Sequence, residues 1–134
     1  IKKHWERYLK EISMINNHIP VMLDEVKSFI PANKDINLID ATFGGGGYSK
    51  AILEEFKIKN LIAIDRDPIS NIYFNQLNKK YQNIKLFNEK FSKIDELINQ
   101  SKFLNEKFDV IIFDLGLSSN QIDNPERGFS FQNK

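Results

Sequence analysis

The pattern of apolar and polar positions along the chain predicts a regular succession of strands and helices. Short apolar runs bounded by polar or turn-forming residues predict strands over 37–40, 61–64, 84–88 and 109–114. Apolar residues at helical spacing predict helices over about 23–29, 48–56, 67–81 and 94–98. Strands that alternate with helices indicate an α/β fold, with an open, mostly parallel sheet and right-handed crossovers.

Local sequence patterns define some of the element boundaries. Asp67 precedes Pro68, which is typical of an N-cap followed by proline at the first helical position. Ser92 and Asp95 have the spacing of a capping box, with Asp in place of the usual Glu. The run at 109–114 is continuously apolar between its two acids, which predicts a strand buried on both faces of a parallel sheet.

Residues 1–17 are expected to form a helical leader, and residues 18–134 to form the domain itself. Within the leader, one helical face collects the apolar side chains Ile1, Trp5, Tyr8, Leu9 and Ile12. A helix docked on the domain, or a frayed leader, is favoured over a nucleic-acid-binding arm, because Glu6 and Glu11 dilute the basic charge.

Four consecutive glycines, Gly44 to Gly47, connect the first strand to the helix behind it. Glycines permit a sharp turn with positive φ and a close ligand approach, and a helix N-terminus offers unpaired N–H groups. Asp65 follows the second strand, 21 positions after Gly44, where such sheets place an acid that accepts hydrogen bonds from ribose hydroxyls. A nucleotide-type ligand is therefore favoured over a plain surface turn, and Asp67 is read only as the helix cap.

The residues around the glycines favour S-adenosylmethionine over a nicotinamide dinucleotide. The dinucleotide fingerprint has Gly or Ala at its third position, where this chain has Ser49. Asp40 stands before the loop, where it would repel a pyrophosphate but could accept a hydrogen bond from the ammonium group of S-adenosylmethionine. The N–H groups of Gly46, Gly47 and Tyr48 could bind the carboxylate of that cofactor.

Asp114 ends the fourth strand, at the switch point where open sheets bind ligands. Its carboxylate could orient an exocyclic amine for methyl transfer and stabilise the developing positive charge, or could merely cap the strand. The loop at 123–131 contains Arg127, Phe129 and Phe131. It could stack a base and hold a phosphate, or pack its aromatic rings into the core.

Composition excludes several other classes of function. The 134 residues are 41% hydrophobic and 28% charged, which fits one globular domain, and the net charge of +1 means that any basic surface is local. The absence of cysteine excludes disulfides and thiolate metal sites, and the isolated His4 and His18 predict no metal centre. No apolar run approaches the roughly 18 residues of a membrane span and no signal peptide is recognised, so a cytoplasmic location is expected.

Together, five ordered blocks resemble a known family. They span 18–25, 40–49, 63–68, 113–123 and 126–131. In order and spacing they are similar to the bacterial small-subunit ribosomal RNA cytosine-N4 methyltransferases of the MraW/RsmH type. The resemblance implies a Rossmann-like fold, S-adenosylmethionine as cofactor, and N4 of a cytidine in small-subunit ribosomal RNA as target. The cofactor contacts that it implies are Gly46, Gly47, Tyr48, Asp65, Phe91, Asp114 and Gln121, with Asp114 also the candidate catalytic residue.

The chain departs from the family pattern in two respects. Tyr48 stands where the family usually has His, and family members continue beyond the block at 126–131 with further strands and an inserted helical domain. We therefore expect a C-terminally incomplete fold whose fourth strand is a sheet edge with exposed apolar surface. Such a chain is expected to form a cofactor half-site without methylating RNA alone. The alternatives are a small-molecule methyltransferase and a non-catalytic cofactor-binding module.

Overall fold

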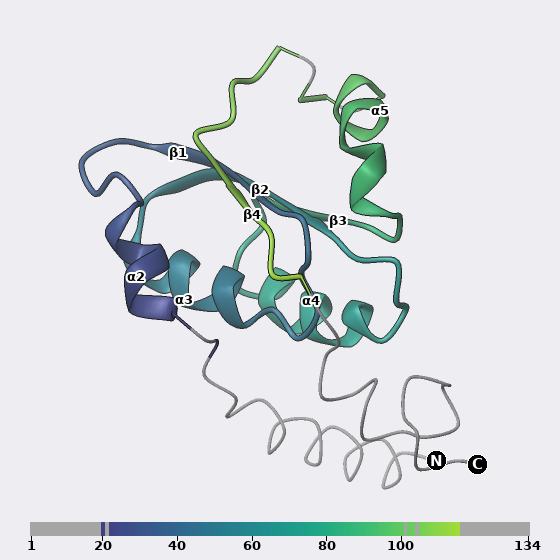
Figure 1. Ribbon diagram of the computed structural model, residues 1–134, viewed down its shortest axis with the longest axis horizontal. Coiled ribbons are helices and arrows are strands. Elements are labelled where there is room, and N and C mark those ends of the chain that lie inside the picture. Colours follow the sequence, from purple (N-terminus) through teal and green to yellow (C-terminus); the bar gives the residue numbers. More distant parts are fainter. Residues whose placement is uncertain (1–19, 21, 101, 104, 116–134) are drawn as a thin grey trace, which may run out of the picture.

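The computed structural model describes residues 20, 22–100, 102–103 and 105–115 (Figure 1). The described part contains α2 (Leu23–Ser28), β1 (Ile36–Asp40), α3 (Gly47–Glu55), β2 (Ile58–Ile64), α4 (Ser70–Asn78), β3 (Ile84–Phe87), the 3₁₀ helix η1 (Phe91–Lys93), α5 (Ile94–Asn99) and β4 (Val110–Ile112). The predicted leader, the loop at 123–131 and Gln121 lie outside these residues. Among the described residues, no helix has the length and apolar character needed to cross a membrane.

The strands form one parallel sheet in the order β3-β2-β1-β4. Helices α3 and α4 pack on one face of the sheet, and α5 covers the other (Figure 1). The predicted α/β fold is thereby confirmed. The chain direction across the sheet reverses between β1 and β4, so the loops that follow these two strands flank the switch point.

Strand β1 is the centre of the core, and all five of its residues are buried. Leu38 packs in the cluster under α3 and α4, whereas its neighbour Ile39 packs in the cluster under α5. The same alternation continues in β2, because Leu61 pairs with Leu38 and Ile62 pairs with Ile39. Because helices cover both faces of the sheet, alternate apolar side chains of one strand contribute to both clusters.

Two predicted helix starts differ from the observed ones. The carboxylate of Asp67 accepts a hydrogen bond from the N–H of Ile69 at 3.1 Å, so it caps a turn, and α4 itself begins only at Ser70. The predicted capping box is wrong: Ser92 lies inside η1, and α5 begins after Lys93 without a side-chain cap. The chain is already coiled before α5, since the Lys93 N–H donates to the carbonyl of Lys90 at 3.0 Å.

Strand β4 is shorter and more exposed than predicted. Ile112 is buried, but Ile111 is 48% exposed, so the prediction of burial on both faces is wrong for this strand. In the described part β4 is the outer strand beside β1, and the α5 cluster packs on residues of β1 and β2. The predicted edge position with exposed apolar surface is confirmed for this part of the chain.

A polar network fixes the segment that leads into β4. The buried side chain of Asn37 donates to the carboxylate of Glu106 at 3.1 Å and to the carbonyl of Lys107 at 2.9 Å, and accepts from Asn60 at 3.0 Å. The N–H of Asn37 also donates to the Asp109 carboxylate at 2.9 Å. These bonds hold the chain before β4 against the amino ends of β1 and β2. They therefore help to fix the register in which β4 pairs with β1.

Candidate functional site

The glycine loop turns sharply at the carboxyl end of β1. Gly44 and Gly46 have φ values of 54° and 76°, and the N–H of Gly46 donates to the carbonyl of Phe43 at 2.8 Å. A Cβ added to Gly46 would lie 2.8 Å from Cζ of Phe43, and one added to Gly47 would lie 2.6 Å from Cγ of Pro20. The predicted need for positive φ is confirmed. The closest neighbours of Gly46 and Gly47 are the protein's own rings.

Asp40 lies beneath this loop and is fully buried. One carboxylate oxygen accepts the Ser49 hydroxyl at 2.6 Å, and the other accepts the N–H of Thr42 at 3.3 Å. Burial is the main cause that raises the pKa of Asp40 to about 6; the two hydrogen bonds oppose the increase, and the nearby carboxylates of Asp65 and Asp114 add to it. Because none of its surface is exposed, direct contact with a ligand ammonium does not fit this arrangement. Ser49, read from the sequence as a departure from the dinucleotide fingerprint, is the buried partner of Asp40.

Asp65 joins the second strand to the glycine loop. Its carboxylate accepts the N–H of Gly44 at 2.6 Å and the N–H of Asp67 at 2.8 Å. Burial is the main cause that raises the pKa of Asp65, and these two hydrogen bonds oppose it. The 21-residue spacing thus corresponds to a direct contact between Asp65 and the loop. Each carboxylate oxygen has two lone pairs, so both keep capacity for a further donor.

Asp114 lies just beyond β4, and its side chain is exposed. Its N–H donates to the Thr42 hydroxyl oxygen at 2.7 Å, which ties the end of β4 to the loop after β1. Tyr48 lies near the same group: burial raises the pKa of its hydroxyl, and the charges of Asp114 and Asp40 add to the increase. Carboxylates from the ends of β1, β2 and β4 therefore converge beside the first turn of α3.

Phe91 forms an aromatic pair with Phe113, a residue that the sequence analysis did not single out. The ring centroids are 5.6 Å apart at an interplanar angle of 81°, an edge-to-face arrangement. Phe91 is 43% exposed and Phe113 is 48% exposed. Phe91 follows β3 and Phe113 follows β4, which are opposite edges of the described sheet, so the pair spans the carboxyl ends of the strands.

Six of the seven predicted contact residues lie in the described part of the chain, and Gln121 lies outside it. Asp65 contacts the glycine loop, Tyr48 lies near Asp114, and Phe91 lies beside Phe113. Thr42 and Phe113 were not predicted from the sequence. The signal in the sequence that could have indicated them is their position after a predicted strand, since Thr42 is the second residue after β1 and Phe113 directly follows β4.

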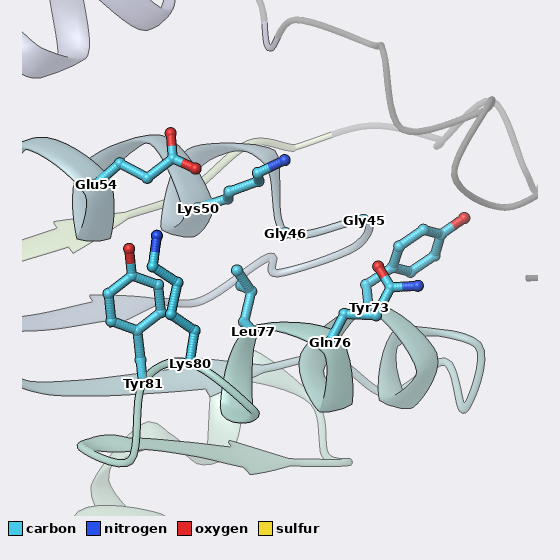
Figure 2. Close-up of a pocket in the computed structure, with 9 residues that line it drawn as sticks. All are labelled: Gly45, Gly46, Lys50, Glu54, Tyr73, Gln76, Leu77, Lys80 and Tyr81. Carbon is cyan, nitrogen blue, oxygen red and sulfur yellow. The ribbon is translucent and has the colours of Figure 1, made fainter.

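A separate hollow of about 310 Å³ lies between α3 and α4 (Figure 2). Its lining consists of Gly45, Gly46, Lys50, Glu54, Tyr73, Gln76, Leu77, Lys80 and Tyr81. Gly46 is its one residue in common with the predicted contact set, and none of the three converging carboxylates lines it. The converging carboxylates therefore favour a ligand site at the carboxyl ends of the strands over one in this hollow. In the part of the chain that the structure describes, no three acidic or histidine side chains are grouped to hold a metal ion.

Comparison with known proteins identifies the family. The model of the MraW methylase family matches residues 15–134. The chain belongs to this family. Its curated relatives include "Ribosomal RNA small subunit methyltransferase H" of Caldicellulosiruptor bescii, 48% identical over 85% of this chain, and of a Wolbachia species from Drosophila simulans, 47% identical over 85%. A human relative, "12S rRNA N(4)-cytidine methyltransferase METTL15", is 39% identical over 90%.

These matches confirm the family resemblance that the five sequence blocks indicated. The aligned regions cover 37%, 38% and 30% of the three relatives, respectively. The chain therefore spans about a third of the length of these relatives.

Proposed function

We propose that this chain is the cofactor-binding part of an S-adenosylmethionine-dependent methyltransferase that modifies N4 of a cytidine in small-subunit ribosomal RNA. The observation that carries the proposal is the convergence of Asp40, Asp65 and Asp114 around a glycine turn. A concentration of negative charge favours a cationic ligand over a pyrophosphate. The names of the relatives supply the RNA class and, in one case, the cytidine N4 position.

The residues present fit that cofactor. The charges of Asp65 and Asp114 already raise the pKa of Asp40, so a sulfonium or ammonium nearby would relieve an unfavourable interaction. Asp65 has acceptor capacity for ribose hydroxyls, and the half-exposed ring of Phe91 offers an apolar surface for adenine. The N–H groups of Gly47 and Tyr48 would bind the carboxylate, whereas the N–H of Gly46, which was also predicted to bind it, already donates to the carbonyl of Phe43. The cofactor, when bound, supplies an electrophilic methyl group on sulfur.

Asp114 is the proposed catalytic residue. Its exposed carboxylate can accept an N–H from the exocyclic amine of the target base, which aligns the nitrogen lone pair and stabilises the positive charge that develops on it. Tyr48, which stands where the family resemblance implies His, lies near this carboxylate. Gln121 completes the proposed contact set.

Residues 18–134 are proposed to form the N-terminal part of the methyltransferase domain, in the cytoplasm, with a helical leader at 1–17. A small-molecule methyltransferase or a non-catalytic module would share the same cofactor residues. Such proteins would differ at the RNA contacts, for which Arg127 and the aromatic residues of its loop are the candidates.

The first test is calorimetric titration of the 134-residue chain with S-adenosylhomocysteine, with NADH in parallel. Saturable binding of S-adenosylhomocysteine is expected, and Asp65→Ala should abolish it, because that substitution removes the acceptor for the ribose. Asp67→Asn is the matched control, since Asp67 caps a turn and lies outside the proposed contacts. Thermal unfolding of each variant verifies that it is folded. Binding of NADH instead, or of neither ligand, would contradict the proposal for this chain.

A further inference from the structure

The pairing of β1 with β4 ends in an unusual way. Leu38, Ile39 and Asp40 pair in register with Val110, Ile111 and Ile112, and the N–H of Ala41 then donates to the carbonyl of Ile112 at 2.9 Å. In a regular parallel ladder, the next hydrogen bond would run from the N–H of Asp114 to the carbonyl of Ala41. That N–H instead donates to the side-chain oxygen of Thr42 at 2.7 Å.

The Thr42 hydroxyl takes the place of the Ala41 carbonyl as acceptor because of the turn that follows β1. The Asp40 carboxylate holds the N–H of Thr42, and the Asp65 carboxylate holds the N–H of Gly44. At this point the backbone after β1 has therefore turned away from β4 and toward β2. A side chain that projects back from the turn can still reach β4. Thr42 therefore bridges the two strands at the point where they diverge, which is the switch point of the sheet.

This hydrogen bond is exposed to solvent, which separates its effect on position from its effect on stability. If it were broken, water could satisfy both the Asp114 N–H and the Thr42 hydroxyl, so the stability that it adds is small. It acts, however, on the backbone of the same residue that carries the exposed carboxylate. Its main consequence is to fix the backbone position from which the Asp114 carboxylate projects.

We propose that Thr42 is a positioning residue: its hydroxyl holds the backbone of Asp114 so that the carboxylate lies at the carboxyl ends of the strands, where the cofactor is proposed to bind. Buried Asp40 and Ser49 support it, because they hold the N–H of Thr42 and the start of α3 in place. This inference rests on the proposed function, since it takes Asp114 to be a ligand contact.

The test compares Thr42→Val, which keeps the side-chain shape without the hydroxyl, with Thr42→Ser, which keeps the hydroxyl. Amide hydrogen exchange followed by NMR reports on the Asp114 N–H directly: exchange should be faster in Thr42→Val and near the wild-type rate in Thr42→Ser. Affinity for S-adenosylhomocysteine should fall about 3- to 10-fold in Thr42→Val, the range expected for one ordinary hydrogen bond, and stay within about twofold in Thr42→Ser. In an Asp114→Ala background, Thr42→Val should have no further effect on affinity.

The outcomes distinguish this inference from the proposed function. If the wild-type chain binds no S-adenosylhomocysteine, the proposed function fails for this chain and the inference fails with it. If the wild-type chain binds and Thr42→Val binds equally well, the positioning role alone is refuted, even where the amide exchanges faster. An equal loss of affinity in the Asp114→Ala background would also refute it, because Thr42 would then act elsewhere. Thr42→Ala repeats the comparison should the valine variant not fold.

Discussion

The buried carboxylate of Asp40 should make the stability of this protein depend on pH in a defined direction. Its pKa in the folded chain is about 6, against an ordinary value of 3.8, and burial is the main cause. Between these two values the folded state binds more protons than the unfolded state, so the free energy of unfolding falls as the pH rises through this window. A shift of about two units corresponds to a loss on the order of 3 kcal/mol between pH 4 and pH 7.

Asp40→Asn tests this reasoning, because an amide stays neutral at every pH. The difference in stability between Asp40→Asn and the wild type at a single pH is not informative, because an amide has one acceptor oxygen for the two donors that Asp40 holds. The informative quantity is the slope: urea unfolding from pH 4 to pH 7 should show a smaller decline for the variant than for the wild type. Some decline should persist, because burial also raises the pKa of Asp65.

Asp95→Asn, at an exposed position on α5, is the matched control for the loss of one carboxylate. Parallel profiles for the wild type and Asp40→Asn would refute the reasoning, and would mean that Asp40 is as well solvated in the folded chain as in the unfolded one.

Two further substitutions test the loop and the amino edge of the sheet. Gly46→Ala should lower the free energy of unfolding by about 1–3 kcal/mol in urea titrations, because its φ is 76° and its Cβ would meet Phe43 at 2.8 Å. Gly45→Ala, at an exposed position, should change it by under about 0.5 kcal/mol, and equal effects would contradict the described turn. Asn37→Ala should cost about 2–3 kcal/mol, because it leaves buried partners without their hydrogen bonds, and exposed Asn99→Ala should cost under about 0.5 kcal/mol. Similar losses for the two asparagines would contradict that network.

The elements and their order could be predicted from sequence, because the period of apolar residues directly reports which faces are buried. The prediction failed where burial depends on distant neighbours. The apolar run around Ile111 looks like a central strand, yet exposure there depends on which strands and helices lie beside it. Likewise, Ser92 has the spacing of a cap, but it lies inside a 3₁₀ turn in which the N–H of Ile94 already donates to the carbonyl of Phe91.

The site was predictable where a short-range pattern encodes it and hidden where a long-range contact does. The glycine turn and the spacing to Asp65 are local signals of a strand, a turn and a second strand. The contact between Thr42 and Asp114 joins residues 72 positions apart, and the threonine carries no local mark of that role. The Asp40–Ser49 pair was missed because a buried polar pair is indistinguishable in sequence from two residues that face a ligand.

The position of β4 in the sheet also affects the order of assembly. Leu38 pairs with Leu61, 23 positions later, but with Val110, 72 positions later. By the logarithmic dependence of loop closure on length, the longer closure costs about 1 kcal/mol more in chain entropy. The unit from β1 to β3 can therefore assemble from near-neighbour contacts, whereas β4 must return across the whole of it. The residues after β1 and β4 are thus brought together by the longer of the two chain closures, so a ligand that contacts both would require the complete sheet.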